Sequence, residues 1–266
     1  MRIRDACWLW GHEPGSHNAG WGLPAPSRIS PVEAAWYLNI PNLIMVRYGT
    51  APLPPDAQYL VPFRTMRRVV WSVVGAGGSH QQGELDRVLA VCRQLPNTVG
   101  VIMDDFFRQG AAEHAVFSRS DLLGLRQQLA RAERPLELWV VLYGYQLDWP
   151  VAQHLALCDK VTFWTWEARD LDQLEANFGR FERLVPEGKR RVLGCYLWDY
   201  GQKRPMPLER MQRQCELGRR WLTEGRIAGL IFLASCICDL DLETVEWTRR
   251  WLGEVGDQAI APAADI

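Results

Sequence analysis

The sequence is short of net charge, of long hydrophobic runs and of patterned cysteines. Its 266 residues contain 30 Lys and Arg against 31 Asp and Glu, which gives a formal net charge of -1. Such a balance gives no reason to expect nucleic acid or an anionic membrane surface as a partner. None of its hydrophobic stretches reaches the roughly 18 residues that a membrane-spanning helix needs. We therefore expect a protein that binds neither nucleic acid nor a membrane.

The seven cysteines follow no pattern that would bind zinc or build a disulfide framework. They are odd in number, and Cys236 and Cys238 form a C-x-C pair with no second pair at the spacing of a zinc site. Scattered thiols of this kind are typical of a reducing compartment. The start of the chain also has Asp5 where the apolar part of a signal peptide would lie. These features predict a cytoplasmic protein with no structural zinc.

A pattern of short apolar runs, each followed by an amphipathic stretch, repeats eight times along the chain. The runs are residues 6–10, 43–46, 69–74, 99–103, 136–142, 161–164, 192–197 and 229–233. Runs that are apolar on both faces are typical of buried parallel strands. Eight such units in about 250 residues are the size of a (β/α)8 barrel. We predict a single (β/α)8 TIM barrel over residues 1–258, with 259–266 as a flexible tail. An open doubly wound sheet is less favoured, because the glycines of 75–78 lack the nucleotide-binding spacing.

The amphipathic stretches predict helices at the positions where a barrel needs them. The expected helices cover residues 30–38, 57–60, 84–95, 120–133, 151–158, 171–184, 208–224 and 242–255. Ser30 followed by Pro31 is typical of a helix start. Four prolines at 52, 54, 55 and 62 crowd the second stretch, so only one or two short turns are expected there.

Acidic residues follow several of the expected strands. Barrel enzymes place their chemistry at the C-terminal ends of the strands, and a carboxylate buried there is costly unless it has a partner or a function. The candidate catalytic residues are Asp104, Asp105, Glu167 and Asp199. Alternation along the strand favours Asp104 as the inward side chain and Asp105 as one that orients loops.

Aromatic and polar side chains accompany these acids at the same strand ends. Sugars present C–H faces that lie against aromatic rings and hydroxyls that bind carboxylates, so this mixture predicts a small carbohydrate or glycoside as the ligand. The expected substrate-binding residues are His12, Glu13, His17, Arg47, Tyr143, Tyr145, Trp164, Trp166 and Trp198. Trp164 and Trp166 share one side of their strand, and either could instead belong to the barrel core.

The segment Gly100–Phe107 resembles the fourth strand of glycoside-hydrolase-type barrels, where a glycine and an apolar run end in one or two acids and an aromatic residue. The resemblance implies a carboxylate that reacts with or holds the substrate at Asp104 or Asp105. In some such barrels the second carboxylate follows the sixth strand, which here implies Glu167. In others it follows the seventh, which implies Asp199.

The favoured hypothesis is glycoside hydrolysis by two carboxylates, with no metal and no cofactor. Asp104 would be the nucleophile or base and Glu167 the acid, its pKa raised by tryptophans, with Asp199 as a substitute for either. Two alternatives stay open at this point. One is a metal-dependent sugar isomerase, epimerase or lyase, since the same acids and histidines include possible metal ligands. The other is a barrel that binds a glycan without catalysis.

Overall fold

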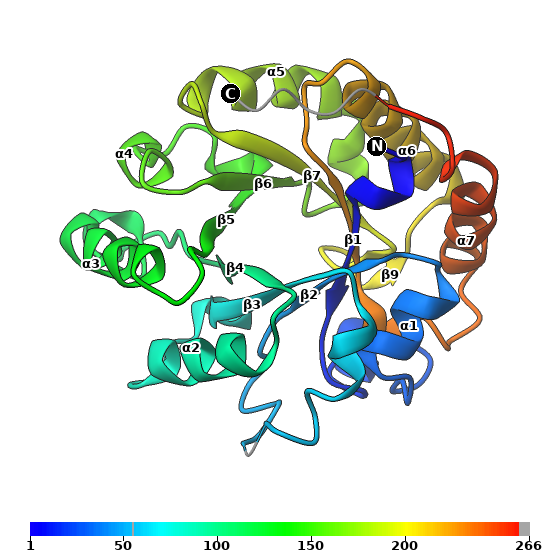
Figure 1. The fold of residues 1–266 in the computed structure, drawn as a ribbon. Helices are drawn as coiled ribbons and strands as arrows, with labels where there is room; N and C mark the ends of the chain where they lie inside the picture. Colours follow the sequence, from blue (N-terminus) through cyan, green and yellow to red (C-terminus); the bar gives the residue numbers. More distant parts are fainter. Residues whose placement is uncertain (55, 261–266) are drawn as a thin grey trace.

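A closed barrel of eight parallel strands forms the centre of the protein, as the sequence predicts. The computed structural model describes residues 1–54 and 56–260. The strands are β1 (Cys7–Gly11), β2 (Asn42–Met45), β3 (Arg68–Val74), β4 (Thr98–Met103), β5 (Glu137–Tyr143), β6 (Lys160–Trp164), β7 (Arg190–Tyr196) and β10 (Leu230–Leu233). They pair in chain order, and β1 closes the barrel against β10. Figure 1 shows the ring of strands with the helices around its outside.

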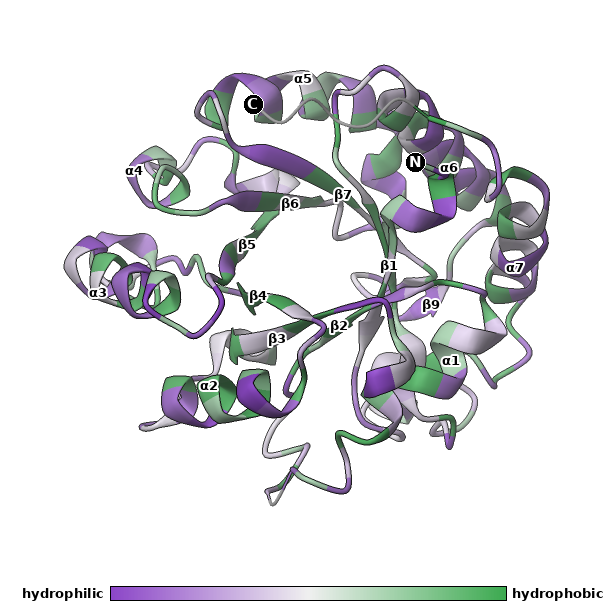
Figure 2. Cartoon of the chain, in the orientation of Figure 1, coloured by the Kyte–Doolittle hydropathy of each residue, from purple (hydrophilic) through white to green (hydrophobic). Residues whose placement is uncertain are grey.

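Seven α-helices pack around the barrel in the described part of the chain. They are α1 (Pro31–Tyr37), α2 (Glu84–Gln94), α3 (Arg119–Ala130), α4 (Ala152–Leu155), α5 (Leu174–Leu184), α6 (Leu208–Thr223) and α7 (Glu243–Val255). The predicted start of α1 is confirmed, because the Ser30 side chain accepts a hydrogen bond from the Glu33 amide and Pro31 opens the helix. In Figure 2 the helices alternate hydrophobic and hydrophilic residues, and the strands are largely hydrophobic apart from hydrophilic stretches at the starts of β6 and β7.

The described residues of the connection from β2 to β3, all but residue 55, contain no α-helix. Residues 57–60 form turns, and a short 3-10 helix follows at Pro62–Thr65. Proline lacks the amide hydrogen that a continuing helix uses, which explains why this proline-rich connection does not form the regular helix of the other units.

Tryptophans fill the inside of the barrel. Trp8 meets Trp139 with ring centroids 4.9 Å apart, and one level higher Trp10 meets Trp164 at 5.4 Å. Gly194 on β7 makes room for the Trp164 ring, since a Cβ atom at this glycine would lie 2.1 Å from it. The barrel is therefore packed solid below its C-terminal end, so a ligand can enter only above this layer.

Two features lie outside the repeating pattern. A small hairpin of β8 (Trp198–Asp199) and β9 (Arg204–Pro205) follows β7 and was not predicted. At the chain ends, Ala259 pairs with Arg2, and the Ile260 amide donates to the Met1 carbonyl at 2.8 Å. The other residues of the predicted tail, 261–266, lie outside the described residues.

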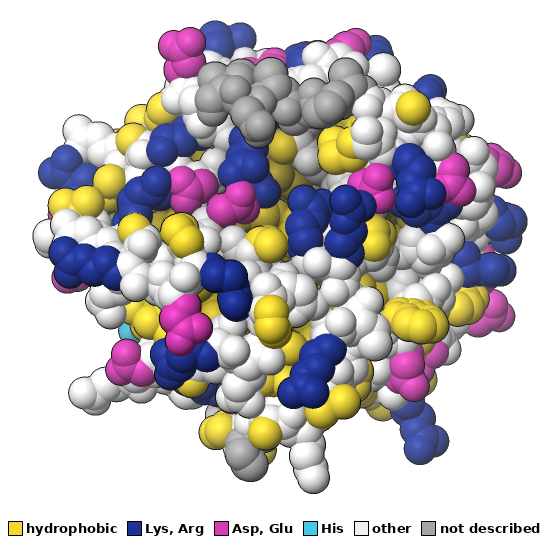
Figure 3. All heavy atoms as spheres, in the orientation of Figure 1, with side chains coloured by type: hydrophobic (Ala, Val, Ile, Leu, Met, Phe, Trp, Pro, Cys, Tyr) yellow, Lys and Arg dark blue, Asp and Glu magenta, His cyan; other side chains and the backbone are white. Residues whose placement is uncertain are grey.

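The outer surface mixes charges of both signs. Figure 3 shows Lys and Arg spread over the visible face with Asp and Glu among them. None of the helices in residues 1–54 and 56–260 is both long and apolar enough to cross a membrane. All seven cysteines are free and buried.

Candidate active site at the barrel mouth

The C-terminal ends of the strands surround a cavity of about 290 Å³. Its aromatic lining consists of Trp10, Trp21, Tyr48, Tyr143, Trp166, Tyr196 and Tyr200. Its ionisable lining besides these tyrosines consists of His12, His17, Asp104 and Asp105. Ligand pockets usually measure about 300–1,000 Å³, so this cavity fits a compact molecule such as one sugar ring.

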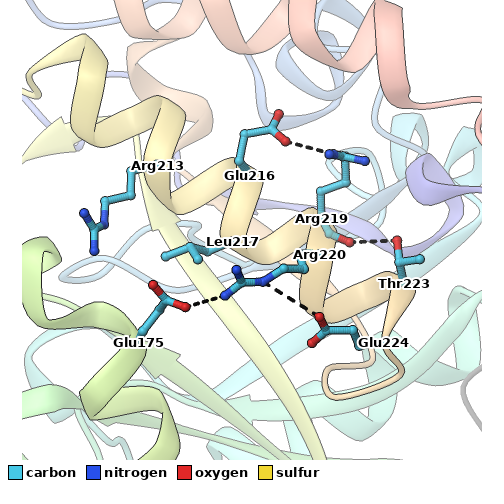
Figure 4. A pocket seen from close by; sticks show the side chains of 8 residues that line it. All are labelled: Glu175, Arg213, Glu216, Leu217, Arg219, Arg220, Thr223 and Glu224. Atoms are coloured by element: carbon cyan, nitrogen blue, oxygen red, sulfur yellow. Dashed lines mark hydrogen bonds and ion pairs between the residues drawn. The ribbon is translucent and has the colours of Figure 1, made fainter.

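A larger hollow of about 600 Å³ lies between α5 and α6 on the outside of the barrel. Figure 4 shows that most of its charged side chains pair with one another, while Arg213 has no partner among the residues drawn. Arg220 binds Glu175 and Glu224, and Arg219 binds Glu216. These groups are about half exposed, and exposed pairs of this kind hold surface helices together weakly. The mouth cavity, which collects residues from several strand ends, is therefore the better candidate site.

Asp104 is a buried carboxyl group at the floor of the site. Only 6% of the residue is exposed, and one of its carboxyl oxygens accepts a hydrogen bond from the Asp105 amide at 2.9 Å. Burial, and next the negative charge of Asp105, raise its pKa well above the usual 3.8. No Lys or Arg of the described chain forms an ion pair with it. Asp104 therefore holds a proton more tightly than an ordinary aspartate.

Asp105 lines the same cavity, although strand alternation alone would send its side chain to the opposite side. The strand ends at Met103, and Asp105 adopts a left-handed backbone with φ of 45°. One carboxylate oxygen accepts a hydrogen bond from the Gly77 amide at 2.7 Å, and the other accepts one from the Tyr143 hydroxyl at 2.7 Å. These donors, from the loop after β3 and the end of β5, fix the carboxylate in place.

Both histidines of the cavity are buried, and burial lowers the pKa of each. Trp10 donates its indole N–H to His12 Nε2 at 3.1 Å, while His12 Nδ1 lies 2.9 Å from the Val46 carbonyl. A carbonyl accepts only, so Nδ1 carries the hydrogen, and both ring nitrogens are engaged. Burial lowers the pKa of His12 to about 4. His17 Nδ1 lies 2.8 Å from the Tyr200 hydroxyl, and burial, then the neighbouring His12, hold its pKa well below 6.5.

The predicted aromatic residues lie at different depths. Trp166 and Tyr143 line the cavity, with centroids 6.0 Å apart and planes at 86°. Tyr145 is exposed and stacks on Tyr143 at 5.3 Å. Trp164 lies in the barrel core with its indole N–H on Thr162, and Trp198 is buried with its N–H on the Trp21 carbonyl. Trp164 and Trp198 are not among the residues that line the cavity.

Glu167 and Asp199 lie beside the cavity rather than in its wall. Glu167 pairs with Arg169 and accepts a hydrogen bond from the Gln202 side chain at 3.0 Å. Asp199 is 1% exposed and accepts hydrogen bonds from the Ala168 and Gln202 amides, both at 3.2 Å. Both carboxylates thus brace the segment that follows β6 against the β8–β9 hairpin.

Arg47 and Glu13 have protein partners of their own. The Arg47 guanidinium, 2% exposed, lies 3.2 Å from Glu84 and donates to the carbonyls of Gly49 and Ser79. It therefore ties the end of β2 to the loop that carries Gly77. Glu13 is partly buried, which raises its pKa, while a hydrogen bond with Tyr59 opposes this change.

Five aromatic residues line the cavity beyond the predicted set, namely Trp10, Trp21, Tyr48, Tyr196 and Tyr200. Tyr48, Trp21 and Tyr200 follow strand ends, which is a signal that the sequence carries. Trp10 and Tyr196 lie inside their strands, where apolar periodicity does not distinguish a cavity wall from core.

No three His, Cys, Asp or Glu side chains among the described residues come together in a way that could hold a metal ion.

No protein-family model matches the sequence, and no curated protein matches it.

Solved structures resemble the chain in fold. A candidate alpha-L-fucosidase from Bacteroides thetaiotaomicron VPI-5482 aligns with a TM-score of 0.60 at 12% identity, over 96% of this chain and 94% of that chain. The tryptophan synthase A-subunit from Pyrococcus furiosus aligns with a TM-score of 0.53 at 9% identity, over 96% and 98%. At these identities the likenesses show the (β/α)8 fold alone.

Proposed function

We propose that this protein is an enzyme that hydrolyses small glycosides in the mouth cavity, with Asp104 as the proton donor. The observation that carries the proposal is the environment of Asp104, a cavity-lining carboxyl group whose pKa is raised well above 3.8 by burial and by Asp105. Glycoside hydrolysis needs a carboxylic acid that stays protonated near neutral pH to protonate the departing oxygen. The aromatic lining would contact the C–H faces of one sugar ring.

The reaction assigns a step to each carboxyl group. Asp104 gives its proton to the glycosidic oxygen as the bond from this oxygen to the anomeric carbon breaks. Water adds to the anomeric carbon, and its proton passes to the Asp105 carboxylate, which the Gly77 amide and the Tyr143 hydroxyl hold in position. Proton transfer from Asp105 back to Asp104 restores the starting state.

These roles differ from those that the sequence favours. Glu167 lies outside the cavity lining and pairs with Arg169, so Asp104 is the better-placed acid. The candidate alpha-L-fucosidase among the structural neighbours shares the fold of this chain. This likeness is compatible with a sugar-processing barrel and does not extend to the residues of the site.

The test is hydrolysis of a panel of small alkyl glycosides, whose leaving groups need a proton to depart, by the wild-type chain and by Asp104→Asn. We expect turnover of at least one sugar, and its loss in Asp104→Asn with the fold intact by circular dichroism. The matched control is Asp148→Asn, whose side chain is 86% exposed. No turnover across the panel, or full activity of Asp104→Asn, would overturn the proposal.

A further inference from the structure

Four aromatic rings of the cavity form a closed circuit of contacts. Trp21 meets Trp166 with centroids 6.1 Å apart and planes at 77°, and Trp166 meets Tyr196 at 5.9 Å and 84°. Tyr196 meets Tyr200 at 5.5 Å and 60°, and Tyr200 meets Trp21 at 5.5 Å and 83°. We call these four residues the aromatic box. Every wall is steeply inclined to the next, and all four rings line the same cavity.

The spacing of the box suits a small cation. A square with sides of this length has its centre about 4 Å from each corner, which is inside the roughly 6 Å over which a ring attracts a positive charge. The faces of aromatic rings are negative and their edges positive. Several inclined rings around one point are the arrangement that recognises ammonium groups.

The remaining charges of the cavity favour a cation as well. Burial raises the pKa of Tyr196, and next to burial the negative charge of the nearby Asp105 raises it further. The lowered pKa values of His12 and His17 keep both imidazoles uncharged near neutral pH. Among the described residues, no Lys or Arg lines the cavity.

Three cationic side chains lie near the cavity without entering its lining, and the buried one, Arg47, pairs with Glu84. The Lys203 ammonium lies 5.7 Å from the Trp21 ring, and Arg108 packs beside Gly78. Neither is among the groups that shift the pKa of Asp104. The lining thus contains two carboxyl groups and no positive charge, which a neutral sugar would not require.

We propose that the substrate carries an ammonium group that lies in the aromatic box beside Asp105, so that the site takes an amino sugar rather than a neutral, acetylated or acidic one. This inference rests on the proposed function, because it names the sugar class that the same cavity would accept. On binding, the ammonium group would lose its hydration shell and contact the ring faces and the Asp105 carboxylate instead. An acetylated nitrogen has no charge and cannot make this exchange.

The test is calorimetric titration of the wild-type chain at pH 7 and constant ionic strength. The probes are 2-amino-2-deoxyglucose, its N-acetyl derivative, glucose, glucuronate and tetramethylammonium chloride. We expect the free amine to bind at least tenfold more tightly than the N-acetyl sugar, glucose or glucuronate. We also expect tetramethylammonium to compete with it.

Variants identify where the amine binds. Trp166→Leu and Asp105→Asn should each weaken amine binding at least tenfold, while Trp166→Phe, which keeps a ring, should lose less than Trp166→Leu. Trp36→Leu is the matched control, since Trp36 is 68% exposed on α1. Thermal unfolding establishes that each variant folds. Equal loss in Trp166→Leu and Trp36→Leu would overturn the assignment to the box.

Failure of the inference and failure of the proposed function give different results. Equal or tighter binding of the N-acetyl sugar or glucose overturns the inference, and Asp104-dependent hydrolysis of neutral glycosides would then still support the proposed function. Binding of tetramethylammonium through the box, with no binding of any sugar, overturns both the amino-sugar assignment and glycoside hydrolysis.

Discussion

The two ends of the barrel surround their carboxyl groups in opposite ways. At the N-terminal end, Glu137 binds the Lys160 ammonium at 2.9 Å and also pairs with Arg190. Lys160 in turn lies 4.2 Å from the centroid of the Trp139 ring. At the C-terminal end, Asp104 has a neighbouring carboxylate and aromatic rings but no cation in the cavity lining of the described chain.

This difference indicates that the carboxylate at the N-terminal end stabilises the fold, whereas those at the C-terminal end suit a functional site. The lysine and arginine charges lower the pKa of Glu137, although its burial works in the opposite direction. At the C-terminal end, burial and the charge of Asp105 raise the pKa of Asp104, and the hydrogen bond from the Asp105 amide does not cancel this rise. Structural carboxylates are matched with cations, whereas an unmatched buried carboxyl group beside a cavity is typical of a functional site.

The largest expected effect is on catalysis at the C-terminal end. Asp104→Asn should lower kcat/KM about 10²- to 10⁴-fold on an alkyl glycoside, because general acid catalysis is lost. The loss should be far smaller on a glycoside with an activated leaving group, which departs without a proton. Steady-state kinetics on the two substrates checks this. An equal loss on both would contradict the role of proton donor.

The corresponding change at the N-terminal end should act on stability. Glu137→Gln leaves Lys160 buried near Arg190 and Arg68 without its carboxylate, which should lower the free energy of unfolding by about 3 kcal/mol. Urea denaturation measures the change. We expect kcat of the folded variant to equal that of the wild type. If Glu137→Gln were as stable as the wild type, the ion pairs of Glu137 would not stabilise the N-terminal end, which would contradict the contrast between the two ends.

A smaller effect is expected for Tyr143→Phe. This change removes the hydroxyl that donates to Asp105 at 2.7 Å but keeps the ring. Hydrogen bonds to charged groups contribute about 1.5–3 kcal/mol, so kcat/KM should fall about 10- to 100-fold. Tyr37→Phe is the control, because its hydroxyl binds Glu246 on the surface. Similar losses of kcat/KM in the two variants would contradict the proposal that Asp105 acts as the base.

A further effect is expected on the pH dependence of stability. Because the folded-state pKa of Asp104 is raised, the folded chain binds this proton more tightly than the unfolded chain. The contribution of Asp104 is therefore complete below pH 3.8 and declines as the pH rises through the folded-state value. His12 acts in the opposite sense, since its pKa falls to about 4 and its contribution is lost as the pH falls from 6.5 towards that value.

Comparison with Asp104→Asn isolates the carboxyl group. As the pH rises above 4, the wild type should lose free energy of unfolding relative to the Asp104→Asn variant. Chemical denaturation at several pH values measures it. A difference that does not change with pH would show that Asp104 titrates normally.

The sequence by itself determined the barrel and which of its ends carries the acidic and aromatic residues of the candidate site. Alternating apolar runs and amphipathic stretches specify strands and helices locally, and eight repeats of such a unit have few ways to pack other than a closed barrel. The Gly100–Phe107 segment likewise indicated Asp104 and Asp105, because acids that follow a buried strand are visible in the sequence alone.

Only the tertiary structure decided which acids share the cavity. Glu167, Asp199 and Arg47 also follow strands, yet each lies with partners that are distant in the chain, namely Gln202, Ala168 and Glu84. The aromatic box brings Trp21, Trp166, Tyr196 and Tyr200 together from three connections and one strand. Burial and charge at a site depend on such long-range neighbours, and local sequence patterns do not contain them.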